Sequence, residues 1–175
     1  MRFLHRLLSR CVSWLPHKWP RSHGKSNPEE LPIPRVLAAS ELVTRFVCSE
    51  RQIRKASARP KPGAFNPSPY MELSVVHSSG LSDLELWEIG RKTLSGEVGR
   101  DHIYGRADVP VVSLADVKLR ALRDDKPFVR HTSVIDWPIG SDGNETKALW
   151  KQITLELSED LRINFTFPAM PIGQQ

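Results

Sequence analysis

The chain has 175 residues, of which 39% are hydrophobic and 26% are charged, so it has the size of one domain and the composition of a folded protein. The net charge is +5, but six of the 25 basic residues and none of the 20 acidic ones lie in residues 1–28. The rest of the chain is close to neutral, so the pI of about 9.5 describes the N-terminal segment and gives no general argument for an anionic partner.

Residues 1–15 carry the pattern of a basic amphipathic helix. Leu4, Leu8 and Leu15 fall on one face, and the arginines fall opposite. The pattern predicts contact with a protein partner or a membrane surface, and it also fits a transit peptide, a packed terminal helix or residues absent from the mature protein. The apolar run is short and interrupted by arginines, so we predict no transmembrane segment.

Prolines and small polar residues then predict a linker over residues 16–35, a globular domain over 36–167 and a frayed tail over 168–175. Cys11 and Cys48 lie in different segments and do not suggest a disulfide framework. The lack of a disulfide framework favours a reducing compartment. We therefore predict a cytoplasmic protein, with the membrane periphery as the alternative location.

The domain is predicted to be α+β. Strand patterns cover residues 42–48, 72–77, 119–122, 132–135 and 163–167, and the two principal helices cover 81–94 and 145–161. Shorter helices are expected over residues 49–56 and from Ser113. We predict a mainly antiparallel sheet of four or five strands packed by the two principal helices, with a core of Phe46, Val75, Leu84, Trp87, Val111, Val134, Ile135, Leu149, Ile153 and Leu157.

The strongest candidate for a site is the stretch Arg130–Pro138, where polar groups border a predicted strand. His131 is the sharpest candidate for a general base or hydrogen-bond donor, since Arg130 beside it disfavours the protonated imidazole. The hydroxyl groups of Thr132 and Ser133 could act as nucleophiles, although no nucleophile-elbow motif surrounds them. A histidine at a strand end is also an ordinary hydrogen-bonded surface residue.

Other candidates lie at the ends of neighbouring predicted elements. Arg106 and Arg130 could bind a phosphate or carboxylate, and Asp108 or Asp136 could orient the imidazole. His77 is the second candidate catalytic residue. Arg106 and Asp108 would more commonly form a structural ion pair.

Five basic residues lie close together in the chain, at Arg51, Arg54, Lys55, Arg59 and Lys61. Such a run is a weak indication of a nucleic-acid site, because stacking aromatics are not interleaved with it and a solvated surface is the ordinary interpretation. We therefore leave nucleic acid out of the expected partners. Paired metal ligands at short spacing are also missing, so we predict no metal site and no cofactor.

Several stretches between residues 44 and 160 resemble a group of small, uncharacterised bacterial proteins. The matching pieces are Arg45-Phe-Val, Lys61-Pro-Gly-Ala-Phe, Leu73-Ser-Val, Gly80-Leu-Ser with Leu86-Trp-Glu-Ile-Gly90, Gly105-Arg-Ala-Asp108, and Arg130-His-Thr-Ser-Val-Ile-Asp-Trp-Pro138. The resemblance implies a bacterial cytosolic setting and implies no activity.

The sequence leaves three functions open. The leading prediction is a non-catalytic interaction module, since catalytic motifs are missing and an amphipathic helix precedes the domain. The alternatives are a transferase or hydrolase acting on a phosphorylated or nucleotide-like substrate through His131, His77, Arg106 and Arg130, and a nucleic-acid-binding protein using the run Arg51–Lys61.

Overall fold

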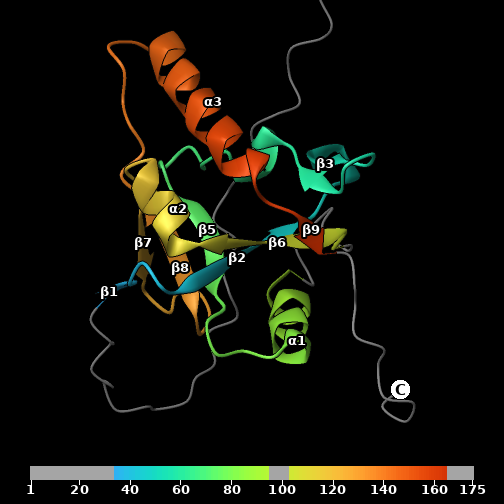
Figure 1. Cartoon of the computed structure of the whole chain (residues 1–175). Helices are drawn as coiled ribbons and strands as arrows, with labels where there is room; N and C mark the ends of the chain where they lie inside the picture. The colour runs from blue at the N-terminus through green and yellow to red at the C-terminus, as the bar shows by residue number, and fades with distance from the viewer. Residues whose placement is uncertain (1–33, 95–102, 165–175) are drawn as a thin grey trace, which may run out of the picture. The chain divides into compact units, whose positions relative to one another are not determined.

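A computed structural model describes residues 34–94 and 103–164, and a seven-stranded antiparallel sheet forms its centre (Figure 1). The strand order is β1-β7-β8-β5-β2-β6-β9. The strands are β1 (Arg35–Val36), β2 (Leu42–Val47), β5 (Leu73–His77), β6 (Gly105–Pro110), β7 (Arg120–Arg123), β8 (His131–Ile135) and β9 (Ile163–Asn164).

The remaining elements are three helices, two 3-10 turns and a separate two-stranded ribbon. The helices are α1 (Asp83–Leu94), α2 (Val111–Asp116) and α3 (Gly143–Glu159); the turns are η1 (Glu50–Gln52) and η2 (Pro62–Phe65); the ribbon pairs β3 (Ile53–Arg54) with β4 (Arg59–Pro60). The α+β prediction is confirmed. The sheet has more strands than the four or five predicted, and two of them, the edge strands β1 and β9, have two residues each.

Each face of the sheet has its own apolar cluster, because side chains alternate between faces along a strand. Val43 and Val47 of β2 join the cluster that includes Leu114 of α2 and Leu157 of α3. Phe46, one position out of phase, joins the cluster containing Leu86 and Trp87 of α1. We call these the α3 face and the α1 face.

Helix α1 begins with a capping box formed by Ser82 and Glu85. The Glu85 amide donates to Ser82 Oγ at 3.4 Å, and the Ser82 amide donates to Glu85 Oε2 at 2.8 Å. Trp87 is fully buried, as predicted, but Leu84 is 44% exposed and its place is taken by Leu86. The reason is the close approach of Gly90 to the Phe46 ring, which turns the Leu86 side of the helix toward the sheet.

Helix α3 is capped by Asp142, which accepts hydrogen bonds from the Asn144 and Glu145 amides at 2.7 and 2.8 Å. The Trp150 indole donates to the Pro138 carbonyl at 2.8 Å and fastens the helix to the chain after β8. Of the predicted core, Phe46, Val75, Trp87, Val111, Val134 and Leu157 are buried, whereas Ile135, Leu149 and Ile153 are partly buried.

The helix predicted over residues 49–56 is wrong beyond its first turn. Ser49 caps η1, which ends at Gln52, and the chain then extends into β3. The cause is tertiary: Ile53 is buried and pairs with Pro60 across the ribbon. The predictions for residues 1–15, most of 16–35, 165–167 and 168–175 concern residues outside the described ranges.

Candidate functional site

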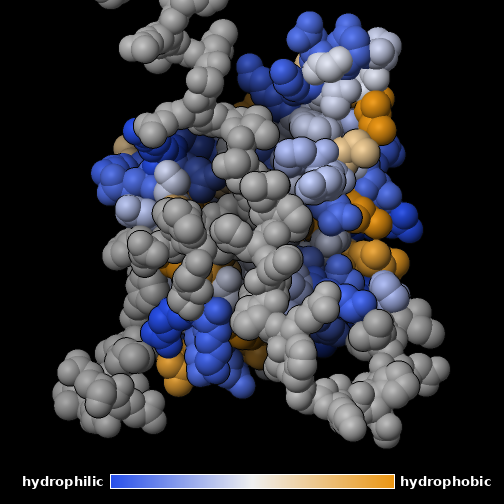
Figure 2. All heavy atoms as spheres, turned by 180° about the vertical axis from the view of Figure 1, so that it is seen from behind, coloured by the Kyte–Doolittle hydropathy of each residue, from blue (hydrophilic) through white to orange (hydrophobic). Residues whose placement is uncertain are grey.

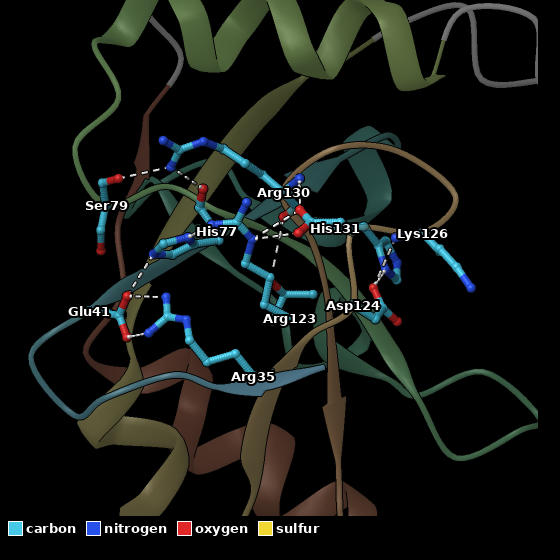
Figure 3. Close-up of polar contacts among 11 residues, drawn as sticks. Arg35, Glu41, His77, Ser79, Arg123, Asp124, Lys126, Arg130 and His131 are labelled. Atoms are coloured by element: carbon cyan, nitrogen blue, oxygen red, sulfur yellow. Dashed lines mark hydrogen bonds and ion pairs between the residues drawn. The ribbon is translucent and has the colours of Figure 1, made fainter. Parts of the chain in front are cut away.

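Three side chains from three parts of the sheet form a continuous hydrogen-bonded chain. His131 Nδ1 lies 2.6 Å from Asp124 Oδ1, and His131 Nε2 lies 3.1 Å from Ser74 Oγ. Asp124 follows β7, His131 opens β8, and Ser74 lies within β5. Figure 3 shows the Asp124 carboxylate and His131 beside the β7–β8 connection. The arrangement has the order carboxylate, imidazole, hydroxyl.

Strand register explains why Ser74 and His131 meet. In the β5–β8 pairing, Val76 lies opposite His131 and Ser74 opposite Ser133, so Ser74 is the diagonal neighbour of His131. Residues two apart on a strand share a face, and diagonal neighbours lie within reach of long side chains. Ser74, Ser133 and His131 therefore all project to the α1 face.

The β7–β8 connection folds Asp124 back onto His131. The amides of Asp124 and Asp125 both donate to the His131 carbonyl, at 3.2 and 3.3 Å. Asp125 and Arg130 adopt left-handed φ angles of 53° and 69°, and the Arg130 amide donates to Asp125 Oδ1 at 2.5 Å. Non-glycine residues adopt this region at a cost, so the loop is held in place by its own side chains.

The Asp124 carboxylate is fixed from several sides. Besides His131, it accepts from the Lys126 amide at 3.2 Å and from Ser133 Oγ at 3.4 Å. A carboxylate held in this way selects the imidazole tautomer that carries its proton on Nδ1. The lone pair of His131 Nε2 then faces Ser74 Oγ and can accept the hydroxyl proton.

Accessibility differs sharply along this chain of groups. The His131 ring is 5% exposed and lies edge-on to Phe128, with ring centroids 5.0 Å apart. Ser74 is an exposed residue of the otherwise buried strand β5. The hydroxyl can therefore meet a substrate while the base behind it is shielded from water.

The backbone at Ser74 is also held. The β2–β5 register pairs Val43 with His77 and Thr44 with Val76. At Ser74 the contact to β2 is made by a side chain, since Arg45 NH1 donates to the Ser74 carbonyl at 2.8 Å and Arg45 Nε to the Ala64 carbonyl at 3.1 Å. Arg45 thus ties Ser74 to η2.

The other predicted histidine, His77, belongs to a separate polar cluster with Glu41, Arg35 and Arg123 (Figure 3). Its Nε2 lies 3.0 Å from Glu41 Oε1, and its Nδ1 lies 3.3 Å from Arg123 NH1. Glu41 in turn accepts two hydrogen bonds from Arg35, at 2.8 and 3.1 Å. The cluster connects β1, β5, β7 and the turn before β2.

The ionisation of this cluster follows from its partners. Hydrogen bonding from Arg35 is the main cause that lowers the pKa of Glu41 to about 2. Burial lowers the pKa of His77 below its ordinary value, and the nearby arginines act in the same direction, while Glu41 opposes them. A neutral His77 with its proton on Nε2 can accept from Arg123 at Nδ1, while Nε2 lies close to Glu41 without making a hydrogen bond to it.

His77 and His131 do not form one site. Val76 shares a face with His131, so its neighbour His77 projects to the opposite face of the sheet. Arg130 points its guanidinium at the carbonyls of His77 and Ser79, at 3.3 and 2.9 Å. Arg130 therefore supports the backbone at the end of β5 and just after it.

The remaining predicted residues lie further away. Arg106 stands on β6, three strands from His131, which corresponds to about 14 Å across a sheet. It pairs with Asp83 at 2.7 Å and with Asp108 at 3.3 Å, as in the structural ion pair considered from sequence. Asp108 also accepts from Thr44 Oγ1, and Asp136 pairs with Arg120. Asp124, rather than Asp108 or Asp136, contacts His131.

The predicted nucleophiles are poorly placed for attack. Thr132 is fully buried and donates to the Arg130 carbonyl, and Ser133 is 4% exposed. Ser74, which sequence reasoning missed, is the exposed hydroxyl. The available signal was its place as the polar position of an otherwise buried strand, Leu73-Ser-Val-Val-His77.

Two hollows in the described part of the molecule lie away from this chain of groups. One, of about 650 Å³, is lined by Asp108, Pro110 and residues 160–164; the other, of about 380 Å³, by Glu50, Ile53, Lys55 and Tyr104. Over residues 34–94 and 103–164 there is no grouping of three metal-ligating side chains. Within the same ranges no helix has the length and apolar character needed to cross a bilayer.

Comparison with known proteins gives no match: no family model, no curated protein and no solved structure is significantly similar to this chain.

Proposed function

We propose that the protein is a hydrolase or group transferase in which Ser74 is the nucleophile, His131 the general base and Asp124 the group that orients the imidazole. The observation that carries the proposal is the continuous contact from Asp124 through His131 to an exposed Ser74 hydroxyl. These three residue types in this order can activate a hydroxyl that is otherwise a weak nucleophile.

The proposed reaction moves one acyl or phosphoryl group at a time. Ser74 Oγ attacks the electrophilic carbon or phosphorus, and its proton passes to His131 Nε2. The leaving group departs and takes this proton from Nε2. Water then attacks the Ser74 ester and gives its proton to the same nitrogen. The bond to Ser74 Oγ breaks, and Oγ takes the proton back from Nε2, which releases the product and restores both residues. In a transferase another hydroxyl or amine replaces water.

We retain a phosphorylated or nucleotide-like substrate as the proposed class, but we do not assign its binding to Arg106 and Arg130. Both guanidinium groups already contact protein atoms. The exposure of Ser74 on an open strand surface favours a substrate that approaches from outside the sheet over one enclosed in a cavity.

The alternative proposal is the interaction module that the sequence favoured, with residues 1–15 as the contact to a protein or membrane. The observation in its favour is that His131 is almost fully buried and has a hydrogen-bond partner at both nitrogens. A histidine of this kind can have a purely structural role, in which it holds β5, β8 and the β7–β8 connection together.

We also propose a cytoplasmic location in a bacterial cell. Its support is the sequence resemblance to small bacterial proteins.

The proposal can be tested without knowing the substrate. A fluorophosphonate probe reacts with an activated serine, whose oxygen displaces fluoride at phosphorus. We expect an adduct on Ser74 in the full-length protein, located by peptide mass spectrometry. Asp124→Asn should slow labelling by about 10²- to 10⁴-fold, because the imidazole loses the partner that fixes its tautomer.

Ser113→Ala is the matched control, since Ser113 is a partly exposed serine on α2, outside the hydrogen-bonded chain. It should label at the wild-type rate, and Ser74→Ala should not label. If wild-type Ser74 reacts no faster than other exposed serines, and Ser74→Ala melts at the wild-type temperature, the catalytic proposal is wrong and the interaction module is favoured.

A further inference from the structure

The β3–β4 ribbon has one apolar face and one basic face. Ile53 and Pro60 lie opposite each other and are buried against the domain. One position along, Arg54 and Arg59 also lie opposite each other, and alternation turns both away from the core. Like charges directly across a strand pair repel, so the ribbon keeps this pair in spite of an unfavourable interaction.

The fold adds a sixth basic side chain from a distant part of the sequence. Arg162 NH1 donates to the Ser57 carbonyl at 2.9 Å, and the next residue, Ile163, donates its amide to the Ala58 carbonyl at 2.7 Å. Ser57 and Ala58 form the turn of the ribbon. The sequence alone gave no reason to group Arg162 with the basic run.

The surface that results is rich in basic side chains. Its basic members, all partly or fully exposed, are Arg51, Arg54, Lys55, Arg59, Lys61 and Arg162. Glu50 is the acidic residue within residues 49–61, and it pairs with Lys55 at 3.1 Å. Figure 2 shows a dense hydrophilic area at the side of the molecule where the ribbon lies. We call this set of residues the basic ribbon.

An aromatic ring lies beside the basic ribbon. The hollow of about 380 Å³ described above is lined by Lys55, Ile53 and Glu50 from the ribbon and its preceding turn, and by Tyr104 from the segment that leads into β6. Tyr104 is partly buried, and its amide donates to the Val47 carbonyl at 2.8 Å. The aromatic side chain that is missing from the basic run in sequence is therefore supplied by the fold.

We propose that the basic ribbon binds single-stranded nucleic acid, with phosphates along Arg54, Arg59 and Arg162 and one base in the hollow beside Tyr104. Basic side chains along a backbone path, combined with an aromatic surface for an unstacked base, are the features by which proteins bind single strands. This binding function is separate from the chemistry proposed for Ser74, whose hydroxyl belongs to the α1 face.

The observations favour a single strand over two other anionic partners. In a duplex the bases are stacked inside, so the hollow beside Tyr104 would have no use. A membrane-binding ribbon would present large apolar side chains at its tip, whereas the tip here is Lys55-Ala-Ser-Ala-Arg59.

Fluorescence anisotropy of a labelled 12-nucleotide oligo-dT, measured with the full chain at several KCl concentrations, tests the proposal. Arg54→Ala/Arg59→Ala should weaken binding at low salt tenfold or more. It should also reduce the slope of log K against log[KCl] by about 1.4, since each lost phosphate contact removes about 0.7 for a single strand. Tyr104→Leu should weaken binding roughly five- to a hundredfold with the slope unchanged.

The matched control is Lys147→Ala/Lys151→Ala, which removes two exposed charges from α3 and should bind within twofold of wild type. Arg162→Ala provides an independent variant if the double ribbon variant melts early. If the ribbon and control variants lose affinity equally, binding depends on overall charge. If the ribbon variants lose no affinity, the strand binds elsewhere, for example at residues 1–28. Either outcome would overturn the proposal. A duplex or a phosphatidylserine vesicle bound as tightly as the strand would also overturn it.

Discussion

Gly90 is the residue at which α1 comes closest to the sheet. A Cβ atom at this position would lie 2.6 Å from Phe46 Cζ, well inside ordinary contact distance. Phe46 also packs against Trp87, with ring centroids 5.8 Å apart, so the ring has neighbours on more than one side. The size of residue 90 therefore decides how closely α1 can pack.

We predict that Gly90→Ala lowers the free energy of unfolding by about 1–3 kcal/mol, the usual cost of overpacking a core. Gly143→Ala is the control, because the added Cβ at that helical position meets no atom within 4 Å. It should be neutral or stabilising, since alanine favours helix over glycine. Urea unfolding of both variants measures the difference, and equal effects would contradict the prediction.

His77 should make stability depend on pH. Its pKa is lowered in the folded protein, chiefly by burial, relative to the ordinary value of 6.5. The unfolded chain therefore binds protons more readily, so stability is complete above pH 6.5 and falls as the pH drops below it. Glu41, with a pKa of about 2 against the ordinary 4.5, adds a further loss between those two values.

We predict that His77→Gln removes the part of this loss that begins below pH 6.5 and leaves the loss below pH 4.5. Urea midpoints measured from pH 2 to pH 8 give both parts. Glu41→Gln is the complementary variant, and it should reduce the loss of stability below pH 4.5. A His77→Gln protein with the wild-type pH profile would show that His77 does not control it.

At the residue scale, the sequence identified His131 but not its partners. A histidine beside a polar strand end can be recognised locally, whereas Asp124 and Ser74 reach it through the β7–β8 turn and the β5–β8 register. Asp108 and Asp136, which the sequence suggested as partners of the imidazole, do not contact it. Pairing register is a property of the whole sheet, so local spacing could not select the correct carboxylate.

The helices illustrate how far local signals reach at the scale of elements. The Ser82–Glu85 box and the Asp142 cap mark the starts of α1 and α3, and both are visible in the sequence. By contrast, β1 and β9 have two residues each, which is too short for any periodic pattern. They exist because β7 and β6 offer unpaired edges to them.

We predict that Asp142→Ala lowers the free energy of unfolding by about 1 kcal/mol, because two amides at the start of α3 lose their acceptor. Asn144→Ala lies in the same turn, removes an exposed side chain and should change stability by a few tenths of a kcal/mol at most. Thermal unfolding followed by circular dichroism compares the two. Equal losses would mean that Asp142 does not act as the cap.

For the whole molecule, the chain divides into two units, residues 1–31 and 32–175. Both apolar clusters and every described strand belong to the second unit. From sequence, the run of prolines predicts a linker over residues 16–35 and a domain that begins at residue 36. Strand order could not be predicted, because antiparallel strands of similar length and apolarity permit many arrangements.

We predict that a chain beginning at Pro32 folds and unfolds at the same temperature as the full chain, within about 2 °C. Both apolar clusters of the described residues lie within residues 32–175, so the shortened chain keeps every side chain that forms them. Differential scanning calorimetry of the two proteins tests this. A melting temperature lowered by several degrees would mean that the N-terminal residues stabilise the domain.

The strand order also has a consequence for the time course of synthesis. β1 pairs with β7, since Arg35 lies opposite Arg123, 88 residues later in the chain. β2 can pair with β6 only after α1 has been made. Contacts between residues so far apart in sequence close large loops, which slows folding. On the ribosome the first strands therefore keep exposed edges until most of the domain has emerged, and unpaired strand edges make the nascent chain prone to aggregate during this interval.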